Sequence, residues 1–210
     1  MPLFYKHHLS NETKIAVWNI AEPESFFLEK VPVSNAITHW HKRLQHLAGR
    51  YLLQELFPDF PYHLIEIADT RKPYLPNEEY HFSISHAGDY AAVIVSRDQR
   101  VGIDIEQAAE KIEKIKHKFL GESEFQGLVA NSNRSDINSK MLTLFWSCKE
   151  AIFKWYGNGK VDFKKHICLK PDDKNLSQGF VICEFSKEKK IMLNIQFKFF
   201  KDTCLSWVVQ

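Results

Sequence analysis

The chain has 210 residues, a formal net charge of +2 and an ordinary hydrophobic fraction of 44%. This length allows one large domain or two small ones with a sizeable core. The near-neutral charge argues against a general polyanion binder such as a DNA-coating protein. The N-terminus lacks the apolar run of a signal peptide, and no stretch approaches membrane-spanning length. We therefore expect a cytoplasmic protein that binds neither nucleic acid nor membranes.

The four cysteines are far apart in the sequence and form no C-x-x-C pair. Zinc sites and disulfide frameworks need cysteines at characteristic spacings. We expect reduced thiols in an intracellular protein.

The first hundred residues predict a strand, a helix and a hairpin. Residues 13–19 carry apolar side chains at both parities, which is typical of a central strand. Ser34 or Asn35 can cap a long amphipathic helix that ends near Pro58. Residues 81–96 alternate around an Ala-Gly-Asp turn, which predicts a β-hairpin.

Basic residues gather on one stripe of the predicted helix. His39, Arg43, His46 and Arg50 fall at helical spacing. This stripe is either a solvated basic face or an anion site. Two further basic candidates, Lys72 in a proline-rich loop and His86 at the hairpin turn, are by themselves ordinary polar loop residues.

The segment VGIDIE, residues 101–106, is the strongest signal for a site. Its alternation predicts a strand with aliphatic side chains on one face and with Gly102, Asp104 and Glu106 on the other. Two carboxylates this close repel each other unless a cation lies between them. A hard divalent ion is the simplest such cation, with Gly102 leaving room for a ligand. A solvated strand edge is the alternative.

The second half predicts helices followed by an antiparallel sheet. Residues 108–117 are helical in pattern, and residues 131–140 form a polar loop. The stretch from Phe145 to Gly157 is also helical, which places Glu150 and Lys154 on one face. Apolar or alternating runs then predict strands at 167–170, 179–185, 191–200 and 204–210.

Together these motifs resemble the 4′-phosphopantetheinyl transferases. That family has a Gly-x-Asp-x-Glu strand followed by a Trp/Phe-Ser/Cys/Thr-x-Lys-Glu-Ala/Ser-x-x-Lys helix. Every place in the pattern is filled, by Gly102, Asp104, Glu106, Trp146, Ser147, Lys149, Glu150, Ala151 and Lys154. The length and the presence of Glu106 are similar to the longer, surfactin-synthetase-activating type.

The resemblance implies an α+β fold that is a monomeric pseudo-dimer of two similar α/β subdomains. The subdomains would span 1–100 and 101–210, with the site at their interface. The chain itself shows no internal repeat, so this two-fold relation comes from the resemblance alone.

The implied activity is transfer of the 4′-phosphopantetheine arm of coenzyme A to a serine of an apo acyl or peptidyl carrier protein. The products are the holo carrier protein and 3′,5′-ADP. Magnesium, or manganese, is expected on Asp104, Glu106 and Glu150. The residues expected to contact coenzyme A are Arg43, Arg50, Lys72, Ser85, His86, Lys149 and Lys154.

The general base stays open between Glu150, which the family favours, Glu124, which occupies the acidic position of a Phe-Phe-Ser-x-x-Glu-like stretch, and a metal-bound water. Glu150 cannot readily serve both as a tight metal ligand and as a free base. Lys154 is expected to stabilise charge in the transition state. Two other functions compete with transfer. One is a metal-dependent nuclease, whose usual Glu-x-Lys spacing is absent here, and the other is a non-catalytic relative that only binds carrier proteins.

Overall fold

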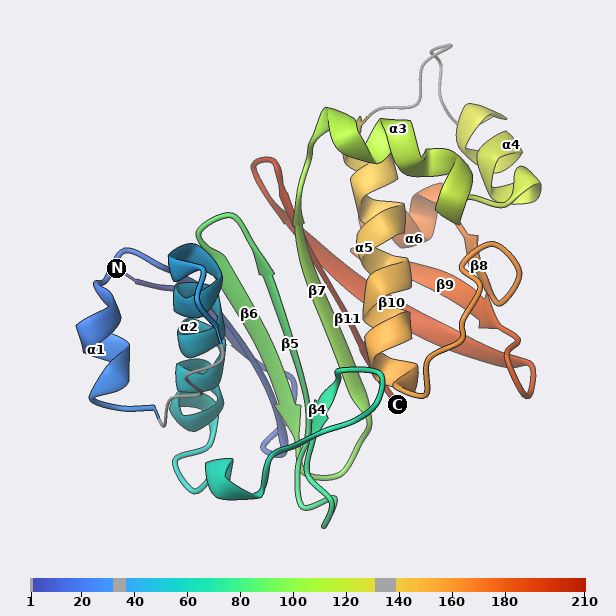
Figure 1. The fold of residues 1–210 in the computed structure, drawn as a ribbon. Coiled ribbons are helices and arrows are strands. Elements are labelled where there is room, and N and C mark those ends of the chain that lie inside the picture. The colour runs from blue at the N-terminus through green and yellow to red at the C-terminus, as the bar shows by residue number, and fades with distance from the viewer. Residues whose placement is uncertain (1, 32–36, 131–138) are drawn as a thin grey trace.

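A computed structural model describes residues 2–31, 37–130 and 139–210. The predicted cap at Ser34 or Asn35 lies outside the described residues, as does most of the predicted polar loop at 131–140. The chain forms a mixed α/β structure with two main antiparallel sheets that lie next to each other (Figure 1).

The first sheet takes all its strands from the first hundred residues, in the order β1-β2-β6-β5. The predicted central strand and hairpin are confirmed, whereas β1 was not predicted because most of its side chains are exposed and its alternation is weak. The strands are β1 (Leu3–His8), β2 (Thr13–Asn19), β5 (His81–Ala87) and β6 (Tyr90–Ser96).

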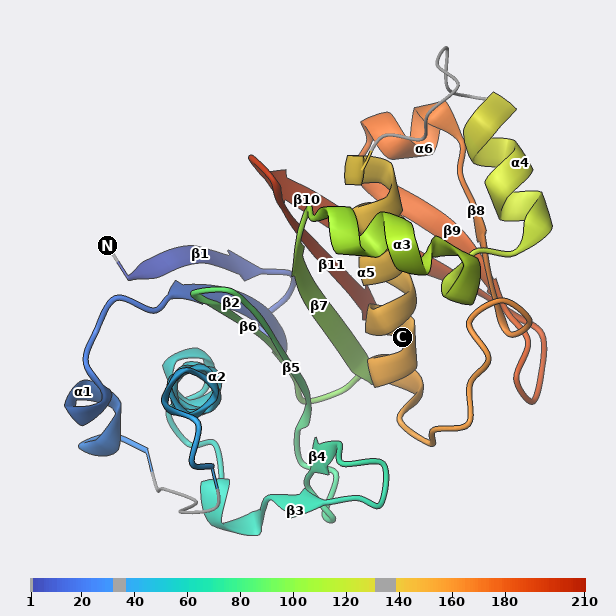
Figure 2. The ribbon, with the colours of Figure 1, turned by 45° about the horizontal axis from the view of Figure 1, so that its top comes forward.

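Helix α2 (Trp40–Leu56) covers one face of this sheet, with the short α1 (Glu24–Leu28) beside it (Figure 2). The helix begins later than predicted, because the His39 ring caps it by accepting a hydrogen bond from the amide of Lys42. Between α2 and β5 lie a 3₁₀ turn at Tyr62–Leu64 and the two-residue strands β3 (Glu66–Ile67) and β4 (Pro73–Tyr74).

The second sheet has the order β7-β11-β10-β9-β8. The predicted strands of the second half are all present, and β7 (Val101–Gln107) contains the VGIDIE segment. The other strands are β8 (Ile167–Lys170), β9 (Phe180–Phe185), β10 (Ile191–Phe200) and β11 (Thr203–Val209).

Helix α5 (Ser139–Tyr156) packs along β7 and β11 and carries the second motif. It begins earlier than the sequence predicted. Helix α3 (Glu110–Phe119) crosses α5, and α4 (Glu122–Ala130) and α6 (Asp173–Ser177) complete the second half (Figures 1 and 2).

The two sheets meet where β5 lies beside β7. The amide of Ile103 donates a buried hydrogen bond of 3.2 Å to the hydroxyl of Ser83. Behind this contact, aliphatic side chains from both sheets share one core, which includes Ile15, Val17, Ile94, Ile103 and Leu205. Sequence-distant strands therefore hold the two halves together through apolar burial and backbone contact.

Gly102 has a different role from the one the sequence suggested. A Cβ atom at this position would lie 2.0 Å from the carbonyl oxygen of Ala151 and 2.6 Å from the amide nitrogen of Trp155. The space beside the carboxylates is thus filled by the backbone of α5, not left open for a ligand. The expectation that Gly102 makes room for a ligand is wrong at this point.

No helix in the described ranges is long and apolar enough to cross a membrane. All four cysteines are free, and three of them (Cys148, Cys183 and Cys204) are buried in the core of the second half. Their thiols lie among apolar side chains, which raises the pKa of each of these three groups.

We predict that Gly102→Ala destabilises the protein by at least ~2 kcal/mol, because the new methyl group must push the backbone of α5 away from β7. Urea unfolding followed by circular dichroism would measure this change. Gly127→Ala is a matched control, since its Cβ would meet nothing closer than 4.0 Å. Inside a helix that change should stabilise by up to about 1 kcal/mol. Equal effects of the two substitutions would contradict the packing argument.

Candidate active site

A pocket of about 430 Å³ opens where β5, β7, α3 and α5 meet. The strands and helices bring together residues that lie up to seventy positions apart in the sequence. Its lining consists of Ile84, Ser85, His86, Asp104, Glu106, Lys111, Ile112, Ile115, Trp146, Glu150 and Lys154. Six of the residues predicted for the site are among them.

Asp104 is the most buried acidic group in this pocket, with 4% of its surface exposed. Its Oδ1 atom accepts hydrogen bonds from the Lys154 ammonium at 2.7 Å and from the Ser85 hydroxyl at 2.9 Å. Lys154 also donates to the Ser85 oxygen at 2.8 Å. The three side chains form a closed triangle that ties β5, β7 and α5 together at the pocket floor.

The second carboxylate oxygen of Asp104 is left without a partner. Within the described part of the chain, Oδ2 is buried and accepts no hydrogen bond. An unpaired buried carboxylate oxygen is costly. An additional cation or donor at this oxygen would therefore be favourable.

The pKa values of the other two acidic groups are raised, chiefly by burial. Burial, together with the charges of Asp104 and Glu106, raises the pKa of Glu150 to about 7, and Lys154 opposes the shift. Burial and Asp104 also raise the pKa of Glu106, although Lys111 lies 3.6 Å away and opposes the shift. Near neutral pH, the pocket thus holds a carboxyl group that can exchange a proton.

These oxygens suit a hard divalent cation, since Mg²⁺ prefers one or two carboxylates together with phosphate and water oxygens. A cation here would give the orphaned Oδ2 of Asp104 a partner and would stabilise the ionised forms of Glu106 and Glu150, which burial and neighbouring carboxylates disfavour. The described residues contain no group of three or more His, Cys, Asp or Glu side chains that forms a ready metal cage. The fit therefore rests on the donor chemistry and on the unsatisfied oxygen.

The predicted basic stripe of α2 divides into two parts. Arg50 donates to the His46 ring at 2.8 Å, so His46 is neutral, and burial together with Arg50 and His86 lowers its pKa to about 4. Arg43 instead pairs with Glu24 of α1. Arg43, His46 and Arg50 all lie outside the pocket lining, although His46 is close enough to His86 for a positive charge on His86 to disfavour protonation of His46.

His86 is exposed at the mouth of the pocket. The pKa of its ring is lowered by partial burial and by the Lys154 ammonium, with Asp104 opposing the shift. A neutral imidazole beside an ammonium group can donate one N–H to an anionic oxygen.

Lys72 joins the first half of the chain to α5. Its ammonium donates to the carbonyl of Lys154, and the neighbouring Thr70 hydroxyl donates to the carbonyl of Gly157 at 3.2 Å. These bonds satisfy carbonyl groups at the end of the helix that have no intrahelical partner. The loop before β4 is therefore held against the C-terminal end of α5.

Lys149 and Glu124 are not brought to the pocket. Lys149 is fully buried, and its ammonium lies 2.7–2.8 Å from Glu124 Oε2 and from the carbonyl oxygens of Phe119, Phe163 and Ile167. Glu124 is 3% exposed and accepts hydrogen bonds from two backbone amides as well. The expectation that these two residues act on a substrate finds no support in this placement.

Sequence reasoning missed the α3 wall of the pocket. Ile112 and Ile115 line it with Trp146, whose ring packs against Phe119 and Phe163. Lys111 of the same helix pairs with Glu106. The sequence predicted a helix at 108–117 but did not indicate which element that helix would cover.

The sequence comparisons agree with this geometry. A sequence model of the 4′-phosphopantetheinyl transferase superfamily matches residues 100–201, which contain β7, α3 and α5. The resemblance to this superfamily that the motifs predicted is therefore confirmed over this segment of the chain.

Named relatives support the same family. The chain is similar to 4′-phosphopantetheinyl transferase gsp of Aneurinibacillus migulanus, at 27% identity over 88% of this chain and 75% of the relative. It is also similar to enterobactin synthase component D of Escherichia coli K12, at 33% identity over 54% of each protein. A third relative is 4′-phosphopantetheinyl transferase psf-1 of Bacillus pumilus, at 35% identity over 38% of this chain and 33% of the relative. The match thus spans about half the length of the enterobactin protein.

We predict that Lys149→Met destabilises the protein by about 3–5 kcal/mol, because it leaves the Glu124 carboxylate buried and unpaired. Urea unfolding would measure the loss. In the Lys149→Met background, Glu124→Gln should cost less than it does in the wild type, because the amide oxygen can still accept from the backbone while the charge is gone. Strictly additive effects of the two substitutions would contradict a coupled buried pair.

Proposed function

We propose that this protein transfers the 4′-phosphopantetheine arm of coenzyme A to a serine hydroxyl of an apo carrier protein. The observation that carries the proposal is the meeting of Asp104, Glu106 and Glu150 with Lys154 in one pocket. Carboxylates that can hold a cation and a lysine that can neutralise phosphate are the groups this reaction needs. The names of the relatives support the same reaction.

The reaction breaks the phosphoanhydride bond of coenzyme A and forms a phosphate ester bond to serine. The serine oxygen attacks the β-phosphorus of coenzyme A, and the bond from that phosphorus to the bridging oxygen breaks. The holo carrier protein and 3′,5′-ADP result, and the serine proton is taken up by a base. Positioning and electrostatic stabilisation supply most of the acceleration in such displacements.

Asp104, Glu106 and Glu150 are the residues that would hold Mg²⁺ or Mn²⁺. When bound, the ion neutralises negative charge on the pyrophosphate. Lys154 lies at the pocket floor with its ammonium on Asp104 and Ser85, within reach of the same charge. Its role is to stabilise the phosphate oxygens as charge develops on them.

Glu150 is the base in this proposal, which requires that Asp104 and Glu106 hold the cation while Glu150 accepts the proton. Of the two side chains considered from the sequence, Glu150 lines the pocket and has a pKa of about 7, whereas Glu124 is enclosed in the interior. A base with a pKa near the working pH is the most effective proton acceptor. A metal-bound water is the alternative base.

Coenzyme A would bind along the interface between the two halves. His86 and Arg50, with His46 between them, offer donors for phosphate oxygens on one side of the catalytic pocket. On the other side, a cavity of about 210 Å³ is lined by Lys72, Pro73, Phe82, Phe153 and Lys154, which suits a nucleotide base. We place the subdomain boundary near residue 100, with each half a sheet covered by one long helix, and we infer a monomeric pseudo-dimer.

The carrier protein would dock on α3, beside the pocket. Lys114 and Lys118 are exposed and four residues apart on one face of this helix, next to the pocket residue Ile115. Neither lysine makes an ion pair with a described residue. Carrier proteins of this kind are acidic, so this face provides the local basic surface that a chain of nearly neutral charge otherwise lacks.

Intact-mass spectrometry of an apo acyl carrier protein tests the proposal directly. Incubation with this protein, coenzyme A and Mg²⁺ should add one phosphopantetheine, and EDTA should prevent the addition. Binding of coenzyme A without any transfer to several carrier types would indicate the non-catalytic relative. Cleavage of a nucleic acid substrate with no transfer would indicate the nuclease.

We predict that transfer falls as the pH is lowered through about 7, because protonation of Glu150 removes the base. Since a cation lowers the pKa of nearby carboxyl groups, this limb of the pH profile should move to lower pH as Mg²⁺ is raised. The residual activity of Glu150→Gln should not show this decrease at low pH. Single-turnover rates between pH 5.5 and 8.5, chosen as a range of about 1.5 units around this pKa, would show it.

The exposed Glu122→Gln is the control for this profile and should behave as the wild type. A limb that persists in Glu150→Gln would contradict the assignment of the base.

We predict that Lys114→Glu with Lys118→Glu raises the KM for the carrier protein on the order of 10-fold, because it replaces attraction by repulsion. The KM for coenzyme A and the stability should change little. Steady-state kinetics at low salt measure both constants. Lys174→Glu with Lys189→Glu makes the same charge change at exposed positions away from α3. A similar loss in that control would argue against docking on α3.

A further inference from the structure

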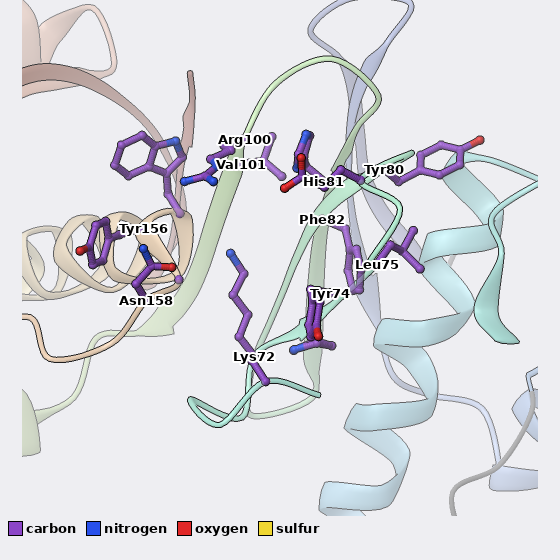
Figure 3. A pocket seen from close by; sticks show the side chains of 15 residues that line it. Lys72, Tyr74, Leu75, Tyr80, His81, Phe82, Arg100, Val101, Tyr156 and Asn158 are labelled. Atoms are coloured by element: carbon purple, nitrogen blue, oxygen red, sulfur yellow. The ribbon is translucent and has the colours of Figure 1, made fainter. Parts of the chain in front are cut away.

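A second cavity lies at the opposite end of the interface between the two halves, with a volume of about 270 Å³ (Figure 3). Its walls come from the β4 region, the start of β5, the turn between β6 and β7, and the C-terminal end of α5. It shares no lining residue with the catalytic pocket. Lys72, Pro73, Phe82 and Gly157 also line the cavity proposed above for the nucleotide base, whereas His81 and Arg100 have no role in the proposed transfer reaction.

Basic side chains from three separate elements line this cavity. Lys72 precedes β4, His81 opens β5, and Arg100 lies just before β7. Figure 3 shows Lys72 and Arg100 extending toward the same space. Glu78 is the one carboxylate among the lining residues, and it makes no ion pair with any described residue.

The donors of this cavity are largely unused. Among the described residues, neither the Arg100 guanidinium nor the His81 ring has a hydrogen bond or an ion pair. Lys72 uses one N–H on the carbonyl of Lys154 at the end of α5, which leaves others available. The Lys72 bond also occupies the carbonyl end of the helix, so the helix terminus repels an anion less.

Positive charge in the cavity is not balanced. Burial lowers the pKa of Lys72 to about 8, and the charge of Arg100 adds to this shift. Burial lowers the pKa of His81 as well, with Arg100 and Lys72 acting in the same direction and Glu78 and Asp98 opposing them. Cations that crowd each other in this way would be stabilised by an anion between them.

We propose that this cavity binds a small anion carrying a phosphate group, at a site separate from the catalytic pocket. The Lys72 ammonium, the Arg100 guanidinium and the His81 ring come from three segments of the chain. Donors arranged in this way match the several oxygens of a phosphate better than the two coplanar oxygens of a carboxylate. The volume suits inorganic phosphate or a small phosphate monoester and is below that of most drug-sized sites. The proposal goes beyond the transfer reaction and does not depend on it.

Inorganic phosphate is the probe for the test. The pKa of the His81 ring is followed by NMR in phosphate and in chloride of the same ionic strength, with His81→Gln to assign the signal. Bound phosphate should raise this pKa, because an adjacent negative charge favours imidazolium. An unchanged pKa at saturating phosphate would overturn the proposal.

Calorimetry gives the second readout. Arg100→Gln should weaken phosphate binding about 10-fold or more, since it removes a charged donor from an otherwise intact cavity. Lys174→Gln removes an exposed lysine on α6 and should bind as the wild type does. Equal binding by Arg100→Gln and the wild type would show that phosphate is held elsewhere.

Phosphate titrations in the presence of saturating coenzyme A test whether the cavity is a separate site or part of the coenzyme A site. Phosphate binding that persists in its presence supports a separate site. Competitive displacement would mean that the cavity belongs to the coenzyme A site, which overturns the proposal. Because the carrier-protein assay is independent of these titrations, failure of one proposal leaves the other unaffected.

Discussion

The site depends on how closely α5 lies against β7. Gly102 lets the helix backbone approach to a distance that any side chain would prevent. This contact sets the helix at a fixed height above the strand, so that Lys154 meets Asp104 and Glu150 stands beside them. A glycine in a strand interior usually weakens the strand, and here the loss is offset by the packing of a whole helix. The acidic residues are therefore positioned by backbone packing more than by their own interactions.

Neighbouring residues of α5 use their charges in opposite ways. Lys149 faces the interior, where its ammonium donates hydrogen bonds to Glu124 and to backbone carbonyl groups. Glu150 faces the pocket, where burial and like charges leave its carboxyl group ready to exchange a proton. One turn later, Lys154 neutralises only one oxygen of Asp104 and leaves the other unpaired. The helix thus has a fully hydrogen-bonded ion pair, Lys149 with Glu124, on one side. On the other side, the pair of Lys154 with Asp104 leaves one carboxylate oxygen without a partner.

Elements with strong periodicity could be predicted from the sequence, and so could the resemblance to the transferase superfamily. Strand β7, the β5–β6 hairpin and the helical nature of the second motif follow from local patterns. The roles of Gly102 and Lys149 could not be predicted, because each depends on which distant element covers that face. A lysine beside a glutamate on a helix has the same local pattern whether it points to solvent, to a ligand or to a buried carboxylate. Only the packing of α3, α4 and β8 decides among these outcomes.

The core between the two sheets has a consequence for how the molecule can be divided. Ile15, Val17 and Ile94 bury their side chains against Ile103 and Leu205, so removing either half would open this shared core, although each half also has a core of its own. Each sheet would then expose a continuous apolar face, which drives association or aggregation. The chain can thus look like two domains in its topology and still fold as one cooperative unit. Two separately expressed halves would be expected to associate, because their exposed apolar faces are complementary.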